Sequence, residues 1–293
     1  MPVSPLSDRV LRGGTLAALV GAVCLLCFVV GFIVWESRIP PAPGISISEF
    51  LFTERWDPSG LPPQFGIGHA WMATLVVVGL AVGMATPLAL VIAIFLSEIA
   101  PRSVRAAAEP VLQLLAGIPA VVYGFVGYAT LVPFFERWLP TGETILIAAI
   151  VLGVMVLPFI ASCAAEALSL VSKDLRAAGL ALGVSRWHTF TRVTLRKAGP
   201  GVLAGVILGL GRGLGETLAV LMLAGNSPVF PTDLLGRGQP LTALIATDLG
   251  ESAMHSERYY ALFSAGLILM CTVIAINLVV VQIKAKFIGN GQH

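Results

Sequence analysis

The stretch from Pro200 to Ala224 is apolar enough to cross a membrane, yet it carries two charged residues, Arg212 and Glu216, near its middle. About 20 apolar residues span the hydrocarbon core of a bilayer, so both charges would lie at membrane depth. Insertion scales put the cost of one central charge at roughly 2.5 to 3.5 kcal/mol, so neither side chain is expected to face lipid. The sequence therefore predicts a helix bundle or a partner subunit that these two side chains face.

Glycines recur on the same face of this predicted helix. At about 100° per residue, an arc roughly 120° wide holds both charges and four glycines that are spaced by four residues. Glycines at this spacing allow a second helix backbone to approach closely. We expect one continuous helix over 200–224 whose charged face is also its packing face, with the glycines Gly201, Gly205, Gly209 and Gly213.

Two interpretations of Arg212 and Glu216 stay open at this point. The two charges could neutralise each other and only fix how the helix packs. Alternatively, they are functional residues of a translocation pathway, which is the default hypothesis for ionisable side chains inside a membrane. Arg before Glu is the weaker order for an ion pair within one helix. This order favours separate partners for the two charges, or a transported anion bound by Arg212.

The whole composition is that of an all-α polytopic membrane protein. Apolar residues make up 57% of the 293 residues and charged residues only 12%, against about 25% charged in soluble domains. Six segments qualify as transmembrane helices by length and polarity, at 15–35, 70–96, 111–135, 144–164, 200–224 and 259–283.

The short connections predict the topology, because Lys and Arg mark cytoplasmic loops. Every second connection is basic, so both termini and the connection at 165–199 are expected in the cytoplasm. The first span is too long for the apolar region of a signal peptide and lacks a cleavage site, so we expect a retained helix. The expected order is a cytoplasmic tail (1–14), a first transmembrane helix (15–35), an extracytoplasmic segment (36–69), a five-helix core (70–283) and a cytoplasmic tail (284–293).

Prolines are expected to interrupt several of these helices. The extracytoplasmic segment is too rich in proline for one helix, but it leaves room for a short element around Ser46 to Phe52. Pro119 predicts a kink in the third span, and Pro87 and Pro158 predict breaks in the second and fourth spans.

The connection at 165–199 has the pattern of a helix, a turn and a second helix. A helix from Ser172 is expected to stop at Gly183, and Ser185 can cap a second helix that runs to about Leu195. The second helix combines apolar residues at three-residue spacing with several arginines. Such a helix could lie on anionic lipid or dock in a groove of a soluble partner, and the pattern alone favours neither.

No pattern indicates catalysis, nucleotide binding or a metal site in this chain. The sequence has no GxxxxGK[ST] phosphate-binding loop, and its histidines lie far apart. Its four cysteines all fall within predicted spans, so neither a disulfide framework nor a zinc site follows. We expect no cofactor on this chain and no nucleic-acid partner.

Several strings carry a family resemblance. The connection at 165–199 is similar to the coupling loop of bacterial ABC importer permeases at 177–179, at Gly183 and at 193–196, although Ala177 replaces the family's Glu and Arg196 its terminal Pro. Three longer strings, PLALVIAIFLSEIAP (87–101), LLAGIPAVVYGF (114–125) and GLGRGLGETLAVLMLAGN (209–226), resemble the PstC-type permease subunits of phosphate importers. The similarity extends from about Thr53 to Lys286.

This resemblance implies the six-helix type I permease fold and a place in the inner membrane of a bacterium, among membrane lipids. The implied partners are a second homologous permease, two cytoplasmic ATPase subunits that bind ATP-Mg, and an extracytoplasmic phosphate-binding protein. It also implies that the ATPase contacts a set of coupling-loop residues, namely Ala177, Gly183, Trp187, Phe190 and Leu195.

Two other interpretations of the function stay open. The chain could import another oxyanion such as molybdate, sulfate or phosphonate. It could also be a membrane scaffold or sensor that docks a partner and transports nothing, because the coupling motif departs from the family pattern at Ala177 and Arg196.

Overall fold

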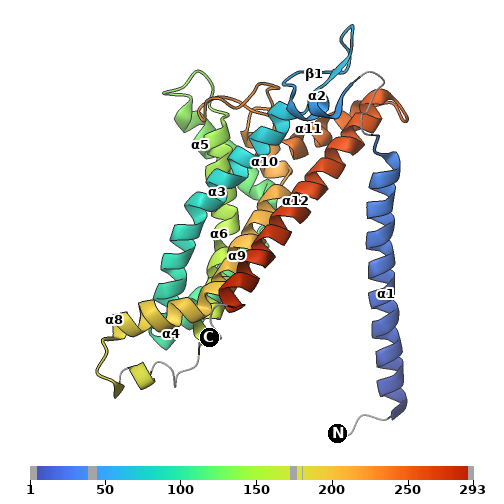
Figure 1. Cartoon of the computed structure of the whole chain (residues 1–293). Coiled ribbons are helices and arrows are strands. Elements are labelled where there is room, and N and C mark those ends of the chain that lie inside the picture. The colour runs from blue at the N-terminus through green and yellow to red at the C-terminus, as the bar shows by residue number, and fades with distance from the viewer. Residues whose placement is uncertain (1–4, 39–44, 172–176, 180, 290–293) are drawn as a thin grey trace.

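The computed structural model describes residues 5–38, 45–171, 177–179 and 181–289, and the side chains at 5–11, 280 and 283–289 lie outside that description. Most of the described chain is helical (Figure 1). The long helices are α1 (Pro5–Glu36), α3 (Gly68–Ile94), α4 (Arg102–Gly117), α5 (Ala120–Phe135), α6 (Ile145–Ser169), α9 (Leu195–Leu214) and α12 (Glu257–Gly289).

Shorter elements connect these helices. The short α-helices are α2 (Ile47–Phe52), α8 (Arg186–Thr189), α10 (Leu218–Leu223) and α11 (Leu241–Asp248). The remaining elements are the strands β1 (Trp56–Asp57) and β2 (Gln64–Phe65), two π-helical segments (Phe95–Ile99 and Phe190–Thr194) and a 3-10 turn (Leu249–Glu251).

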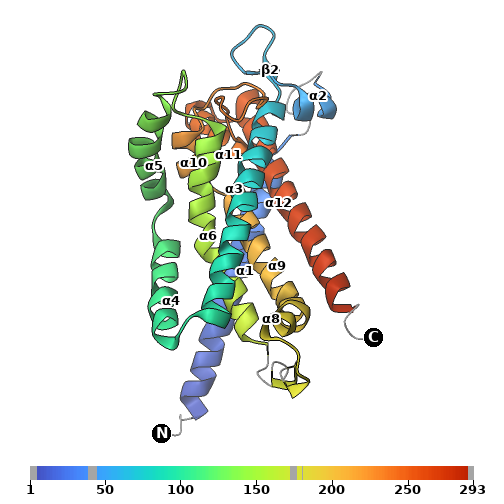
Figure 2. The ribbon, with the colours of Figure 1, turned by 90° about the vertical axis from the view of Figure 1, so that its left-hand side faces the viewer.

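The expected all-α membrane architecture is confirmed. Within the described residues, five helices are long and apolar enough to cross a membrane, and a sixth span results if the bent pair of α4 and α5 counts as one. α6 is the most buried of these spans and packs against both α3 and α9. Figure 2 shows α6 behind α3, with α9 beside it and α4 and α5 at the edge of the bundle.

The third predicted span is two helices and not one kinked helix. α4 and α5 are bent by 87° at the break formed by Ile118 and Pro119. Pro119 has no amide hydrogen and disfavours a helical conformation at the residue before it. Ile118 accordingly has φ −63 and ψ 130, so the helix stops there.

The predicted breaks at Pro87 and Pro158 are wrong. α3 continues through Pro87 as far as Ile94, and α6 continues through Pro158 as far as Ser169. A proline in a transmembrane helix removes one backbone hydrogen bond, but neighbouring helices can hold the helix together. Pro158 is itself buried in the most enclosed helix of the bundle.

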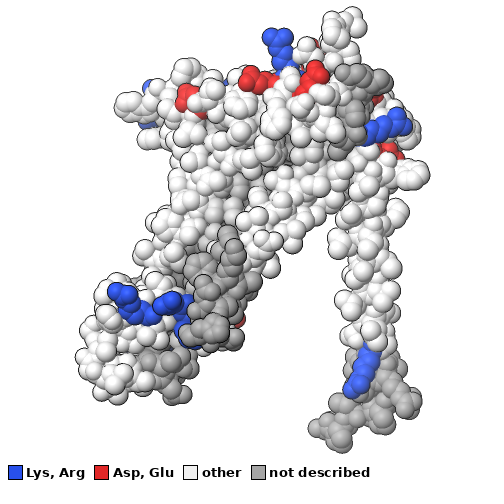
Figure 3. All heavy atoms as spheres, in the orientation of Figure 1, with Lys and Arg blue, Asp and Glu red and all other residues white. Residues whose placement is uncertain are grey.

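The bundle has two ends, which we name after their helices. The α11 end carries α2, the β1–β2 hairpin and α11, and the α8 end carries α8 and the start of α4 (Figure 1). Figure 3 shows that charged side chains gather at these two ends on the face drawn, with an uncharged region between them. This distribution is what a bilayer requires, because charges are costly in the hydrocarbon core.

α1 stands apart from the other helices along most of its length (Figure 1). It is attached to α12 at the α11 end, where the Phe32 and Phe263 rings meet edge to face with centroids 5.7 Å apart. Arg38 also lies 3.8 Å from the ring centroid of Tyr260, and the Ser264 hydroxyl donates to the Arg38 carbonyl at 2.6 Å. The apolar window of α1 is 0% buried, so lipid or another subunit must cover it.

The segment between α1 and α3 forms a small cap at the α11 end. Ser46 and Glu49 form a capping box at the start of α2, so the short element predicted there is confirmed. β1 and β2 pair as an antiparallel hairpin. Trp56 of this hairpin donates to a carboxylate oxygen of Asp248 at 2.6 Å, and Arg258 pairs with the same oxygen at 3.0 Å. These contacts fix the hairpin to α11 and α12.

Candidate functional site

The helix predicted over 200–224 is divided in the structure, so the prediction of one continuous helix is wrong. α9 ends at Leu214 and α10 begins at Leu218, and the residues between them, 215–217, form what we call the α9–α10 break. Glycine and threonine are weak helix formers, and both lie in this break, as Gly215 and Thr217. Interrupted helices are a common way to build a substrate site in a transporter.

The four glycines of the predicted packing face lie against neighbouring helices. A Cβ atom added to Gly205 would lie 2.8 Å from the Cβ of Cys163 in α6, too close for a real contact. The corresponding distances are 2.5 Å from Gly201 to Ala167, 2.8 Å from Gly209 to Ile160 and 3.2 Å from Gly213 to Val78. Glycine therefore allows α9 to approach α6 and α3 closely just before the break.

Arg212 lies in the last turn of α9, next to α6. Its guanidinium carbon is 4.4 Å from the ring centroid of Phe159, and at such a distance an aromatic face attracts a cation. Its Nε is buried and has no hydrogen-bond partner within the described chain. Tyr123 of α5 lies within electrostatic range of this charge. Arg212 therefore retains a donor that these neighbours do not satisfy.

Glu216 is bound within the break. A carboxylate oxygen of Glu216 accepts from the amide of Ala219 at 3.3 Å, in the first turn of α10. Its carbonyl oxygen accepts from the hydroxyl of Thr242 in α11 at 2.8 Å, and its amide donates to the carbonyl of Gly213 at 3.2 Å. Glu216 therefore joins α9, α10 and α11.

Arg212 and Glu216, both of which are among the described residues, do not form an ion pair with each other. This geometry gives no support to the interpretation in which they only neutralise each other. The position of Glu216 also differs from the prediction, because Glu216 lies beyond the end of α9 and not on its glycine face. Chemically, Arg212 can bind an oxyanion, since a guanidinium offers donors that match one.

A second candidate region is the loop between α6 and α9, at the α8 end. The first helix predicted in this loop starts at Ser172. Residues 172–176 and 180 lie outside the described part of the chain, and the described residues 177–179 are helical. Gly183 has φ +70, which glycine adopts readily, so the predicted turn is present. Ser185 caps α8 by accepting from the amide of His188 at 3.3 Å.

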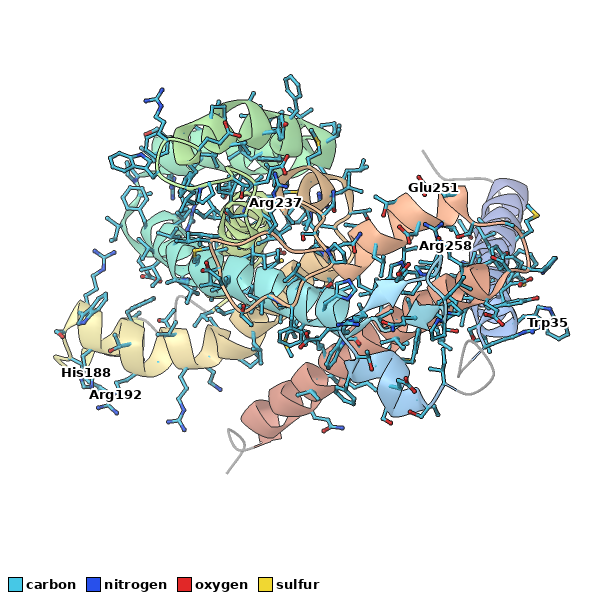
Figure 4. All side chains as sticks on the ribbon, turned by 90° about the horizontal axis from the view of Figure 1, so that it is seen from above. Trp35, His188, Arg192, Arg237, Glu251 and Arg258 are labelled. Carbon is cyan, nitrogen blue, oxygen red and sulfur yellow. The ribbon has the colours of Figure 1, made fainter. Side chains whose placement is uncertain are left out.

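The second helix of this loop does not end near Leu195, and that prediction is wrong. α8, the π-helical segment and α9 run on as one helical stretch from Arg186 to Leu214. Pro200 lies within α9 without ending it, in the same way as the prolines of α3 and α6. The loop therefore continues directly into a membrane span. Figure 4 shows His188 and Arg192 pointing away from the bundle on this stretch.

The two aromatic residues of the loop have different surroundings. Trp187 is 67% exposed, whereas Phe190 is 5% exposed and belongs to the core of this chain. The prediction that Phe190 contacts the ATPase therefore needs correction, because a side chain buried here cannot also fill a groove of a partner. Ala177 and Gly183 are exposed and Leu195 is half-buried.

Comparison with known proteins identifies the family. The family described as "Binding-protein-dependent transport system inner membrane component" matches residues 85–287. The chain belongs to this family. It is 38% identical over 229 residues to the probable ABC transporter permease protein YqgH of Bacillus subtilis, which covers 78% of this chain and 74% of the relative. It is 34% identical over 249 residues to the phosphate transport system permease protein PstC of Xylella fastidiosa, with 78% and 75% covered.

This inner-membrane transport component also has the fold of solved ABC importer permeases. It aligns with a chain of a bacterial importer of the polysaccharide alginate at a TM-score of 0.64 and 16% identity, over 97% of this chain and 99% of that one. A chain of the MetNI methionine transporter aligns at a TM-score of 0.57 and 18% identity, over 73% and 93%. At these identities the likeness establishes the fold, and the expected type I permease architecture is confirmed.

Two residues of this permease that contact Arg212 and Glu216 could not be found from the sequence. Phe159 contacts Arg212 from α6, and Thr242 contacts Glu216 from α11. Both contacts join segments that are far apart in the chain. No periodicity or motif pairs such residues, because their contacts depend on how the helices pack.

Proposed function

We propose that this chain is a permease subunit of an ATP-driven importer for inorganic phosphate, and that it forms the translocation pathway together with a second, homologous permease. The observation that carries the proposal is the position of Arg212 beside an interrupted helix, where it has no carboxylate partner among the described residues. The choice of phosphate is supported by the names of relatives from Xylella fastidiosa and Haemophilus influenzae, both called phosphate transport system permease protein PstC.

In this proposal, Arg212 meets the anion as it passes the α9–α10 break. A bound oxyanion would supply the acceptors that the guanidinium lacks among the described residues. Glu216 acts differently, because its hydrogen bonds to α10 and α11 hold the break in shape. The permease itself performs no chemistry, and ATP-Mg is hydrolysed on two partner ATPase subunits.

The α8 end would face the cytoplasm and the α11 end the extracytoplasmic side. The basic residues of the 165–199 connection support this orientation, because positively charged loops stay in the cytoplasm. The ATPase would then dock at α8, and an extracytoplasmic phosphate-binding protein would dock at the α11 end. A structure of the alginate transporter with the same fold contains a bound periplasmic protein, which supports a partner of this kind.

The orientation predicts which cysteines a membrane-impermeant reagent reaches. Leu61 at the α11 end is 100% exposed, and Leu182 beside Gly183 is 82% exposed. In a cysteine-free background, Leu61→Cys should react in intact cells, and Leu182→Cys should react only after the membrane is opened. The reverse pattern would contradict the orientation.

Trp187 is expected to anchor the ATPase. Trp187 of α8 is exposed, and tryptophan anchors often dominate interfaces. Trp187→Ala should weaken ATPase binding by about 30-fold or more, the effect of losing about 2 kcal/mol. Trp138→Ala is the matched control, since Trp138 is 79% exposed but follows α5 at the other end. Equal ATPase affinity of the two variants in a detergent pull-down titration would contradict this role.

The proposal is tested by reconstitution of the complete assembly. The two permeases, the ATPase pair and the binding protein are placed in liposomes, and uptake of labelled phosphate is measured with competing anions. We expect ATP-dependent phosphate uptake that excess sulfate, molybdate or phosphonate does not suppress. Suppression by one of these anions would assign the chain to that oxyanion. Absence of any ATP-dependent uptake would favour the scaffold or sensor interpretation.

A further inference from the structure

The rings of Trp187 and Phe190 form one contact between the exposed loop and the interior of the bundle. Their centroids lie 5.5 Å apart with an interplanar angle of 30°, so the rings are stacked. Trp187 is 67% exposed and Phe190 is 5% exposed. A partner that encloses Trp187 therefore holds a ring that stacks directly on a side chain of the core.

Phe190 lies where three membrane helices meet at the α8 end. Its cluster contains Ala93 near the end of α3, Ala164 and Leu168 near the end of α6, and Ala198 in α9. Phe190 therefore belongs to one packed cluster with residues near the ends of α3 and α6 and with a residue of α9.

The backbone around this junction departs from regular α-helix at two places. A π-helical segment begins at Phe190, and a second one, Phe95–Ile99, directly follows α3. π-helical turns are rare and often occur at functional positions. The Thr189 hydroxyl, next to Phe190, is buried and has no hydrogen-bond partner among the described residues. These features distinguish the start of the helical stretch from a regular, fully hydrogen-bonded α-helix.

α6 connects this junction to the α9–α10 break. Its Leu168 and Ala164 belong to the Phe190 cluster, and its Phe159 lies under the guanidinium of Arg212. Ile160, between them, contacts the glycine face of α9 at Gly209. One helix, α6, therefore contributes residues both to the cluster that holds Phe190 and to the surroundings of the residue that we place on the anion pathway.

From these contacts we infer that Phe190 is a positioning residue that transmits ATPase docking at Trp187 to α6, and through α6 to Arg212. This inference rests on the proposed function and deepens it. The ATPase holds Trp187, the stacked Phe190 moves with it, and α6 shifts against α9 at the break. Phe190 itself touches neither the ATPase nor the anion.

The test compares coupling with assembly in the reconstituted complex. Phe190→Leu keeps an apolar side chain of similar volume but removes the flat ring that stacks on Trp187. We expect normal ATPase binding and continued ATP hydrolysis, with phosphate uptake per ATP reduced about tenfold, within the range of typical coupling between two sites. Val171→Ala is the matched control, because Val171 belongs to the same cluster but not to the stack, and it should keep a near-normal ratio.

Each possible result of this test either supports or overturns the role of Phe190. A normal uptake-to-hydrolysis ratio in Phe190→Leu would overturn it while the proposed function stands. Loss of ATPase binding in Phe190→Leu, or an equal loss of coupling in Val171→Ala, would also overturn it by showing a role in docking or packing. If the wild-type complex takes up no phosphate, the proposed function fails and the inference fails with it.

Discussion

Replacing Arg212 with leucine is expected to abolish most phosphate uptake while the complex still assembles. Assembly should survive because, in the part of the chain that the structure describes, Arg212 has no carboxylate partner that the substitution would leave buried and unpaired. Uptake should fall by at least about tenfold, since a hydrogen bond to a charged group contributes about 1.5 to 3 kcal/mol. Arg212→Lys should recover only part of the rate, because lysine lacks the bidentate fork. The measurement is ATP-driven uptake at equal amounts of purified complex.

Two further variants separate an anion contact from an ion pair. Glu216→Leu should lower the free energy of unfolding by about 1 kcal/mol, because the Glu216 carboxylate accepts a hydrogen bond from an amide in the first turn of α10. The double variant of Arg212 and Glu216 should stay inactive. Arg137→Leu is the control, because it also removes one positive charge but does so at an exposed position. Near-normal uptake by the well-assembled double variant would show that the two residues serve packing alone.

Gly205→Val is expected to disrupt the contact between α9 and α6. The new Cβ would lie 2.8 Å from the Cβ of Cys163 and 3.2 Å from the carbonyl oxygen of Ile160, before the two methyl groups are added. Overpacking of this kind typically costs about 1 to 3 kcal/mol, and here the obstacle includes backbone, which moves less easily. We expect a lower unfolding temperature in detergent and a poor yield of assembled complex.

Gly211 provides the matched control on the same helix. A Cβ atom on Gly211 would meet nothing within 4 Å. Gly211→Ala should therefore stabilise α9, because alanine is favoured over glycine in a helix by about 0.8 to 1 kcal/mol. Opposite shifts of the unfolding temperature in the two variants are the expected result. A Gly205→Val protein as stable as the wild type would contradict the close approach of α9 and α6.

The positions of the long helices could be predicted because apolar length is a local property of the sequence. α1, α3, α6 and α12 lie close to their predicted segments. Local signals also sufficed for the short element around Ser46 to Phe52 and for the turn at Gly183, where the residue type dictates the geometry.

The break after Leu214 could not be predicted, because the sequence stays apolar through α10 and hydropathy does not distinguish one helix from two. The glycines near it are compatible with close packing as well as with a helix end, and only the packed bundle decides between them. The same applies to the prolines: Pro119 ends a helix on the exposed α4–α5 edge, whereas Pro158 is held inside one by its neighbours.

The burial of Phe190 also could not be predicted from the sequence. Three-residue spacing predicts that Trp187 and Phe190 share a face, and their rings do stack. Which ring is exposed depends on where α3 and α6 end relative to the loop. Arg212 shows the same limit, since its place in an apolar run marks it as unusual, but its contact with Phe159 comes from another helix.

The central claim is that the α9–α10 break lines the path of the anion, and a cysteine placed there tests it most directly. Gly215 is exposed, and an added Cβ would have its nearest neighbour 3.7 Å away, so Gly215→Cys fits without strain. The measurement is the labelling rate of this cysteine by a water-soluble thiol reagent in the reconstituted complex, with no other cysteine in the chain. We expect that this cysteine is labelled, that phosphate binding slows the labelling, and that the rate differs between the nucleotide-free and ATP-trapped complexes. A cysteine that is unlabelled in every state, or labelled at one rate regardless of phosphate and nucleotide, would contradict it.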